Sequence, residues 1–404
     1  MKPSIGWVLL SKDALSRAET QLREDVTGVR DEIGFLLIHS GYANRFFPGT
    51  SVLHTRLRYV LFIPWMYQDL VGDGGHRSIA QRVSITETGL AGRLRDLDGT
   101  IGKRSYPEPT SQPPTFVYWT ALGTWGFLRR RPDGTWPTKS QLHRAIERYG
   151  VASRLTDDDG HYLDDVPDIF IRTPPAPKEW HDHNSALSFR MTQEETAFVR
   201  RQLVGVQKPG DSDMPSLLSY LAENIKKLDI NHASAPWGRP VLQFADAEDK
   251  QALQRSRSAA ALSAVGRAVY AALVETIRED EDGLSTDRRH REHLPMVISR
   301  FQAVSRSLDH DALQADLPGL PAYLLDVVDA TLDWLEKPEN LLDLRDVYAK
   351  AEEIRKGRRS RLPRRFSAKE RRAEWQPQEQ TLAEPIQYRW PNITRLLKDL
   401  KGAG

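Results

Sequence analysis

The sequence predicts a mainly α protein, made of multi-helix domains, with a small winged-helix-like β element in its N-terminal half. The helical class rests on apolar residues that recur at spacings of three, four and seven, as they do over 265–277. It also rests on helix-start signals, of which the Thr-x-x-Glu capping box at 192–195 is the clearest. The β element rests on an aromatic run over 116–128 that leads into a Pro-Asp-Gly turn at 132–134.

The N-terminal half is expected to begin with a short extended segment at 5–10 and to continue as helices. The helix over about 52–71 is apolar on nearly every face, so we expect it to be buried as the hub of this half. Pro64 in its middle predicts a kink or a break into two helices. The helices expected in the first 150 residues are 12–26, 30–40, 52–71, 79–97 and 139–149.

A winged-helix-like unit is expected at about 100–150. Residues 99–115 form a loop rich in Gly and Pro, and 116–128 place five aromatic residues in one short segment. That segment and the basic residues 129–131 would be the strands of the wing, joined to the Pro-Asp-Gly turn. The helix over 139–149 would close the unit.

Composition predicts the domain organisation. Residues 1–150 are expected to form an N-terminal helical domain, and the acidic, Pro-rich stretch 151–190 a connector. Residues 191–404 would form a C-terminal helical domain that carries an Arg-rich segment at 355–372. No repeat with a period of 20–50 residues stands out, so a solenoid is not favoured.

Several classes of protein are excluded by what the sequence lacks. It has no cysteine, which rules out a disulfide scaffold, Cys-ligated zinc, a Cys-ligated iron–sulfur cluster and a cysteine nucleophile. The most apolar stretch, 52–70, is interrupted by charged and polar residues, whereas a membrane span needs about 20 mostly apolar ones. The first residues carry no signal-peptide pattern. We therefore expect a cytoplasmic protein without membrane contact.

Charge is segregated along the chain. The sequence has 57 Lys and Arg against 55 Asp and Glu, a net charge of +2. Residues 355–372 alone hold ten Lys and Arg and one Glu, a net charge of +9, which leaves −7 on the rest. Such a segment attracts phosphate backbones through counterion release, and Arg favours bidentate phosphate contacts. Two interpretations stay open: contact with nucleic acid or another polyanion, and docking on a partner or on the chain's own acidic body.

Two further basic patches lie at 129–148, beside Trp125 and Trp136, and at 288–291. Tryptophans interleaved with Arg can stack bases, but those nearest the Arg-rich segment are expected to pin loops to helices. The residues assigned to nucleic-acid binding are Arg129, Arg130, Arg131, Lys139, Arg144, Arg355, Lys356, Arg358, Arg359, Arg361, Arg364, Arg365, Arg371 and Arg372.

No catalytic residue and no metal site is assigned. His290 and His293 have a workable metal spacing but no third ligand, so a solvated basic helix start is the better interpretation. The polar loop 181–183 is interpreted as surface, and the acidic run 157–159 fails the spacing of a calcium loop. Phosphate-loop and Gly-x-Ser-x-Gly motifs are missing from the sequence. The sequence therefore predicts no cofactor and disfavours an enzyme without excluding one.

Several short blocks of the sequence together resemble one known family. In the N-terminal half they are Pro3-Ser4-Ile5-Gly6-Trp7, Phe47-Pro48-Gly49-Thr50-Ser51, Thr55-Arg56-Leu57-Arg58-Tyr59, Phe62-Ile63-Pro64-Trp65-Met66-Tyr67, Ile101-Gly102 and Tyr118-Trp119. In the C-terminal half they are Arg358-Arg359-Ser360-Arg361-Leu362, Trp375 and Tyr388-Arg389-Trp390-Pro391. The family is an uncharacterised bacterial one, DUF family 6361. The likeness covers nearly the full chain, and only the helix around 259–272 is loosely similar.

The resemblance implies a setting rather than an activity. Members of the family resemble accessory proteins encoded beside helicase-like and phospholipase-D-like nuclease components of bacterial anti-phage islands. The leading hypothesis is therefore a non-enzymatic nucleic-acid-binding or assembly subunit of such a defence system, with DNA and a helicase or nuclease as partners. The alternatives are a protein-interaction scaffold whose basic arm docks an acidic partner, and a metal-dependent nuclease with an unrecognised carboxylate site. Base preference and oligomeric state are left open.

Overall fold

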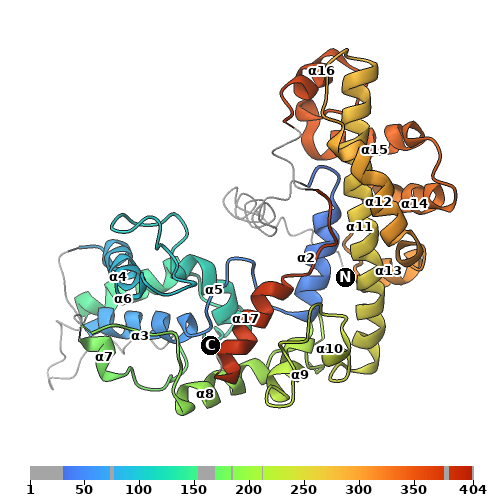
Figure 1. Cartoon of the computed structure of the whole chain (residues 1–404). Coiled ribbons are helices and arrows are strands. Elements are labelled where there is room, and N and C mark those ends of the chain that lie inside the picture. Colours follow the sequence, from blue (N-terminus) through green and yellow to red (C-terminus); the bar gives the residue numbers. More distant parts are fainter. Residues whose placement is uncertain are drawn as a thin grey trace, which may run out of the picture. The chain divides into compact units, whose positions relative to one another are not determined.

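Helices dominate the computed structural model, and the expected mainly α class is confirmed (Figure 1). The structure describes residues 31–72, 77–152, 169–182, 185–211, 213–376 and 382–402. The segments expected at 5–10 and 12–26 and the acidic run at 157–159 lie outside these ranges. Within them no strand or sheet forms, and β pairing is limited to two isolated antiparallel bridges, Leu128 with Phe170 and Gln207 with Pro215.

The chain divides into two compact units, each assembled from segments that are far apart in the sequence. Unit 1 comprises Met1–Ala43, Ala235–Leu242 and Asp246–Tyr388. Unit 2 comprises Asn44–Ser234, Gln243–Ala245 and Arg389–Gly404. The final helix thus joins the N-terminal half in one unit. The domain limits expected at 150 and 190 stay a prediction.

Unit 2 is built around the apolar helix α3 (Tyr59–Gly72), as the sequence predicts for the hub of this half. The helix packs against α4, α5 and α6, and its side chains from Val60 to Tyr67, other than Pro64, are almost completely buried. It begins later than expected, because residues 51–54 form turns closed by side-chain and backbone hydrogen bonds. Pro64 lies inside a single continuous helix, so the expected break does not occur.

The other helices of unit 2 follow in chain order. They are α4 (Ile79–Leu94), α5 (Pro114–Thr124), α6 (Lys139–Ala152), α7 (Lys178–His181), α8 (Gln193–Val204), α9 (Leu217–Glu223) and α17 (Trp390–Lys401). The capping box that the sequence predicts opens α8: the Thr192 hydroxyl accepts the Glu195 N–H, and the Glu195 carboxylate accepts the Thr192 N–H.

The prediction of a winged-helix-like β element is wrong. Most of the aromatic run expected as a strand is the helix α5, which Pro114 opens in a position that needs no N–H donor. Short apolar runs fit a buried helix as well as a strand, and here Tyr118, Ala121 and Leu122 are all buried inside unit 2. Only the single bridge from Leu128 remains of the expected strands.

Unit 1 is organised along one long helix, α11 (Ala247–Asp280), of 34 residues. It lies antiparallel to α12 (Arg289–Ser305), as Figure 1 shows. Small residues along α11 allow close packing: a Cβ on Gly266 would stand 2.2 Å from the Phe35 ring. By length and hydropathy α11 is apolar enough to cross a membrane. However, 89% of the 18-residue stretch that meets this criterion is buried inside the protein.

The remaining helices of unit 1 are short and pack around α11 and α12. They are α10 (Arg239–Leu242), α13 (His310–Asp316), α14 (Ala322–Glu336), the 3-10 helix η1 (Leu341–Leu344), α15 (Arg345–Lys356), the 3-10 helix η2 (Gly357–Arg359) and α16 (Phe366–Ala373). Helix α2 (Phe35–Phe46) runs across the limit between the units at Ala43. It starts later than the expected 30–40, because the Asp31 carboxylate accepts the N–H groups of Gly34 and Leu36 ahead of it.

A buried histidine lies at the centre of unit 2. The His54 Nδ1 accepts the N–H of Ser51 at 3.3 Å, and its Nε2 donates to the Val117 carbonyl at 3.1 Å. The ring stacks on Tyr118, with centroids 4.3 Å apart. Burial lowers the pKa of His54 to about 3, and the nearby Arg389 cation adds to this. The neutral ring is therefore the form that fits.

We expect this histidine to make unit 2 sensitive to acid. Below about pH 6.5 the unfolded chain binds a proton at His54 that the folded chain refuses, so stability is lost as pH falls toward 3. Between pH 5.5 and 4, His54 should lower the free energy of unfolding by about 1.4 kcal/mol for each pH unit. Urea unfolding across this range should show that His54→Gln is less stable throughout and has a shallower pH slope by that amount. His181→Gln, a change at an exposed histidine, should keep the wild-type slope; an unchanged slope in His54→Gln would contradict the prediction.

Candidate nucleic-acid interface

The Arg-rich segment, residues 355–372, continues from the end of α15 into two short helices separated by a loop. Gly357, with φ of +54°, ends α15 in a conformation that few other residues adopt. The 3-10 helix η2 follows, and α16 begins at Phe366 after Pro363. The segment is thus a folded part of unit 1 and not a separate arm.

Six of its ten cations are paired with carboxylates of the same unit. The pairs are Arg355 with Asp31, Lys356 and Arg361 with Glu32, Arg365 with Glu353, Arg371 with Glu374, and Arg372 with Asp282. Apart from the local pair of Arg371 with Glu374, the structure therefore realises docking on the chain's own acidic body, one of the two interpretations left open, for five of the ten cations.

The most buried of these pairs fixes the end of the segment. The Arg372 guanidinium donates to both oxygens of Asp282, at 2.6 and 2.8 Å, and both side chains are under 5% exposed. The main chain is held as well, because the buried Glu352 carboxylate accepts the N–H groups of Arg361 and Leu362 and the Tyr270 hydroxyl. Burial raises the pKa of Glu352, and these donors act in the opposite direction.

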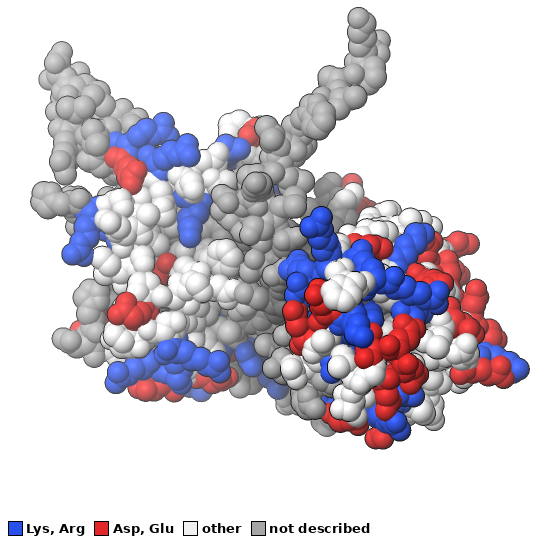
Figure 2. All heavy atoms as spheres, turned by 90° about the horizontal axis from the view of Figure 1, so that it is seen from above, with Lys and Arg blue, Asp and Glu red and all other residues white. Residues whose placement is uncertain are grey.

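Four cations of the segment stay exposed and form no ion pair with the described residues. We call them the exposed cation cluster: Arg358, Arg359, Arg364 and Lys369. Two apolar side chains are exposed in the same stretch, Phe366 at 77% and Ile354 at 57%. Seen from above, the part of unit 1 where α16 lies carries a gathering of Lys and Arg with Asp and Glu beside it (Figure 2). The sequence assigned three of the four cations to binding and missed Lys369.

The second basic patch, at 129–148 in unit 2, is only partly available. Trp125 is buried and donates from its indole N–H to the Pro48 carbonyl at 2.9 Å. Arg131 pairs with Asp133 at 2.8 Å. The Arg130 guanidinium lies over the Trp136 ring, 4.7 Å from its centroid.

Of the other cations of this patch, Lys139, Arg144 and Arg148 lie on α6, and Arg129 lies ahead of it. Arg144 and Arg148 are exposed and form no ion pair with described residues. The Lys139 ammonium lies 3.4 Å from the Thr115 hydroxyl, and Arg129 is exposed. The patch thus contains a few exposed cations and no continuous basic strand.

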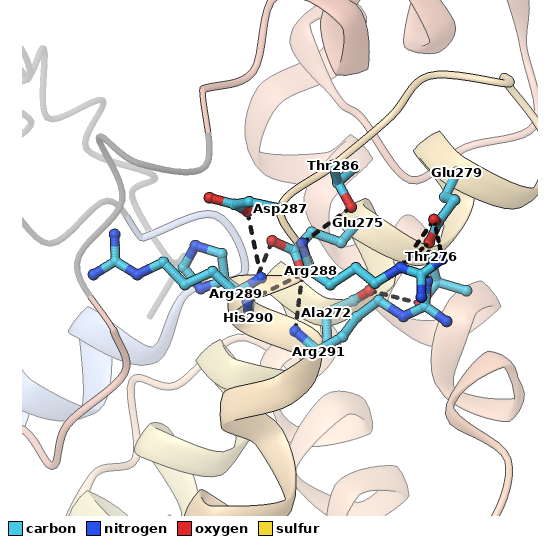
Figure 3. A network of polar contacts seen from close by, with 10 residues as sticks. All are labelled: Ala272, Glu275, Thr276, Glu279, Thr286, Asp287, Arg288, Arg289, His290 and Arg291. Carbon is cyan, nitrogen blue, oxygen red and sulfur yellow. Dashed lines mark hydrogen bonds and ion pairs between the residues drawn. The ribbon is translucent and has the colours of Figure 1, made fainter.

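The third patch, at 288–291, forms the first turn of α12 against α11 (Figure 3). The fully buried Glu275 carboxylate accepts the N–H groups of His290 and Arg291, while Glu279 pairs with Arg288 and Arg291. Carboxylates at this position satisfy free N–H groups and suit the positive end of the helix dipole. These residues hold α12 in place.

The histidines do not form a metal centre in the part of the chain that the structure describes. No group of three or more His, Asp or Glu side chains there could hold an ion. His290 is 3% exposed and packs against Trp375, so the expected solvated helix start is wrong at this position. His181 faces Asp69 at 4.0 Å, and His183 lies outside the described residues.

The tryptophans near the basic residues pin structure, as the sequence predicts. Trp375 and Trp390 are both 3% exposed or less. The Trp390 indole N–H donates to the Ala233 carbonyl at 2.6 Å, and the Arg278 guanidinium lies 5.9 Å from the Trp375 ring. Neither ring is available to stack on a base.

Comparison with known proteins identifies a family without a known role. Residues 4–202 match the model of a family of unknown function, DUF6361. The resemblance read from the sequence is thereby confirmed for these residues. No curated protein and no solved structure matches the chain.

We expect two neighbouring arginines of α16 to differ sharply in their effect on stability. Arg372→Gln leaves a buried carboxylate without its partner and should lower the free energy of unfolding by about 3–5 kcal/mol. Arg371→Gln removes a pair whose side chains are 44% and 62% exposed, and should cost less than about 1 kcal/mol. Urea unfolding of the full-length chain measures both. Equal costs for the two variants would contradict the docking of the segment on unit 1.

Proposed function

We propose that the protein binds nucleic acid, with duplex DNA as the first candidate, through the exposed cation cluster of unit 1. The observation that carries the proposal is that these four cations, within twelve residues of sequence, are exposed and have no ion-pair partner among the described residues. The ion pair of Arg361, which lies between these cations, and that of Arg372, which follows them, hold the backbone that presents them. Preformed cations of this kind contact phosphates without first losing an internal partner.

The residue types favour phosphate contact without base reading. Three of the four cations are Arg, whose planar guanidinium forms bidentate contacts with phosphate oxygens. Phe366, exposed beside them, offers a ring on which an unpaired base can stack. The role that fits is a non-enzymatic binding or assembly subunit, and the anti-phage setting that the family resemblance implies is part of the proposal.

A second candidate is a protein-interaction scaffold with an acidic partner. Exposed Ile354 and Phe366 favour it, since aromatic and Arg side chains are enriched where protein interfaces are most buried. A helicase or nuclease would be such a partner. Under this alternative, the partner would co-purify with the full-length chain while duplex DNA would not bind at low salt.

We expect DNA binding to depend on salt through the exposed cation cluster. The variant Arg358→Gln/Arg359→Gln/Arg364→Gln/Lys369→Gln should bind duplex DNA more weakly at low salt. Its plot of log K against log salt concentration should be shallower by about 3–4, since each phosphate contact contributes about 0.9 to the slope. Fluorescence anisotropy with a labelled duplex across a salt series measures this.

A charge-matched variant controls for net charge. Arg300→Gln/Arg306→Gln/Lys337→Gln/Lys350→Gln also removes four cations from unit 1, all 43–80% exposed and each already paired with a carboxylate. It should keep nearly the wild-type slope. If wild-type protein does not bind DNA at low salt, or if both variants change the slope equally, the proposal fails.

A further inference from the structure

Unit 2 contains a cavity of about 790 Å³ that the proposed function does not use. It lies between the C-terminal ends of α5 and α8 and the loop 205–211. Its volume falls in the range of about 300–1,000 Å³ that is typical of small-molecule sites. Two residues of its wall, Gly126 and Gly210, have φ of +74° and +83°. Residues other than glycine rarely adopt this backbone conformation without strain, so the wall at these positions consists of main-chain atoms.

The charged side chains that line the cavity are mostly basic. Among the described residues, the charged ones on its lining are Arg130, Arg201, Lys208 and Asp211. Within the described residues, neither arginine forms an ion pair, in contrast to Arg56, Arg58 and Arg255 of this protein, which are all paired with carboxylates at 2.7 Å or less. Two exposed guanidinium groups that lack a described carboxylate partner thus line one open cavity.

Arg130 is held in place by aromatic packing. Its guanidinium lies 4.7 Å from the Trp136 ring centroid, and one Nη donates to the Gly134 carbonyl at 3.2 Å. The Trp136 ring in turn lies against Gly123 of α5, where an added Cβ would stand 3.0 Å from the ring. The other N–H donors of the Arg130 guanidinium lie in one plane and suit two oxygens of one anion.

The cations are not used to cap the two helices. At the end of α5, the carbonyls of Ala121 and Leu122 already accept backbone N–H groups from residues 125–128. At the end of α8, the carbonyls of Arg201 and Gln202 accept the Gly205 N–H. Since these carbonyl groups are satisfied by the main chain, the capping role that basic residues commonly have at helix ends does not explain the arginines.

We propose that this cavity binds the phosphate group of a small organic phosphate. The guanidinium groups of Arg130 and Arg201 carry two positive charges, which suit a phosphate monoester dianion. The rest of the cavity, lined by Gln202, Gln207 and Trp136, holds the organic part. The site lies in unit 2 and does not depend on the exposed cation cluster of unit 1.

Calorimetric titration of the full-length chain with inorganic phosphate and with adenosine 5′-monophosphate tests the proposal. We expect saturable binding of both, weakened at least about tenfold by Arg130→Gln and by Arg201→Gln, since each variant loses charge-assisted hydrogen bonds. Both arginines are exposed, so the variants should fold as the wild type does, which circular dichroism verifies.

Two control variants separate this site from the proposed function. Arg144→Gln/Arg148→Gln removes exposed cations of unit 2 that do not line the cavity, and the four-residue variant of the exposed cation cluster alters unit 1; both should keep wild-type affinity for the two ligands. Absence of saturable binding, or equal loss in the controls, would overturn the inference. So would an oligothymidylate that binds and is weakened by Arg130→Gln while the mononucleotide does not bind.

Discussion

Unit 1 depends on the burial of one helix, α11, along almost its whole length. Ionisable groups that this burial removes from water need partners within the unit. Tyr270 donates to Glu352, Glu275 accepts the first N–H groups of α12, and just beyond the helix Asp282 accepts Arg372. The residues around α11 are therefore placed by charge pairing as much as by apolar contact.

This constraint explains what became of the Arg-rich segment. The segment is not a free arm, because carboxylates of α15, of the turn after α11 and of the chain ahead of α2 pair with several of its cations. The pairs with buried members fix the path of the main chain, and the turns between them project the exposed cation cluster. A segment of +9 thus combines two roles that the sequence could not separate: anchoring on unit 1 and presenting a smaller number of cations to a partner.

The sequence predicted elements well where a local signal was strong. The capping box at Thr192 and the periodic apolar patterns of α4 and of 265–277 in α11 all gave the correct element, because each signal acts within a few residues. It failed at 116–128, where β-branched and aromatic residues suggested strands. There, packing against α3 stabilises the helix α5. A short apolar run has no periodic pattern that distinguishes such a helix from a strand.

By itself, the sequence determined the helical class, the family, the loss of all cysteine chemistry and the positions of the basic patches. Only the tertiary structure decided which cations are available, because pairing joins residues as distant as Glu32 and Arg361. The same holds for the cavity of unit 2, where Arg130 comes from the loop after α5, Arg201 comes from α8, and neither lies in a recognisable motif. The sequence alone fixes which residues are charged. Contacts across the fold decide whether each charged side chain is paired with a partner or exposed.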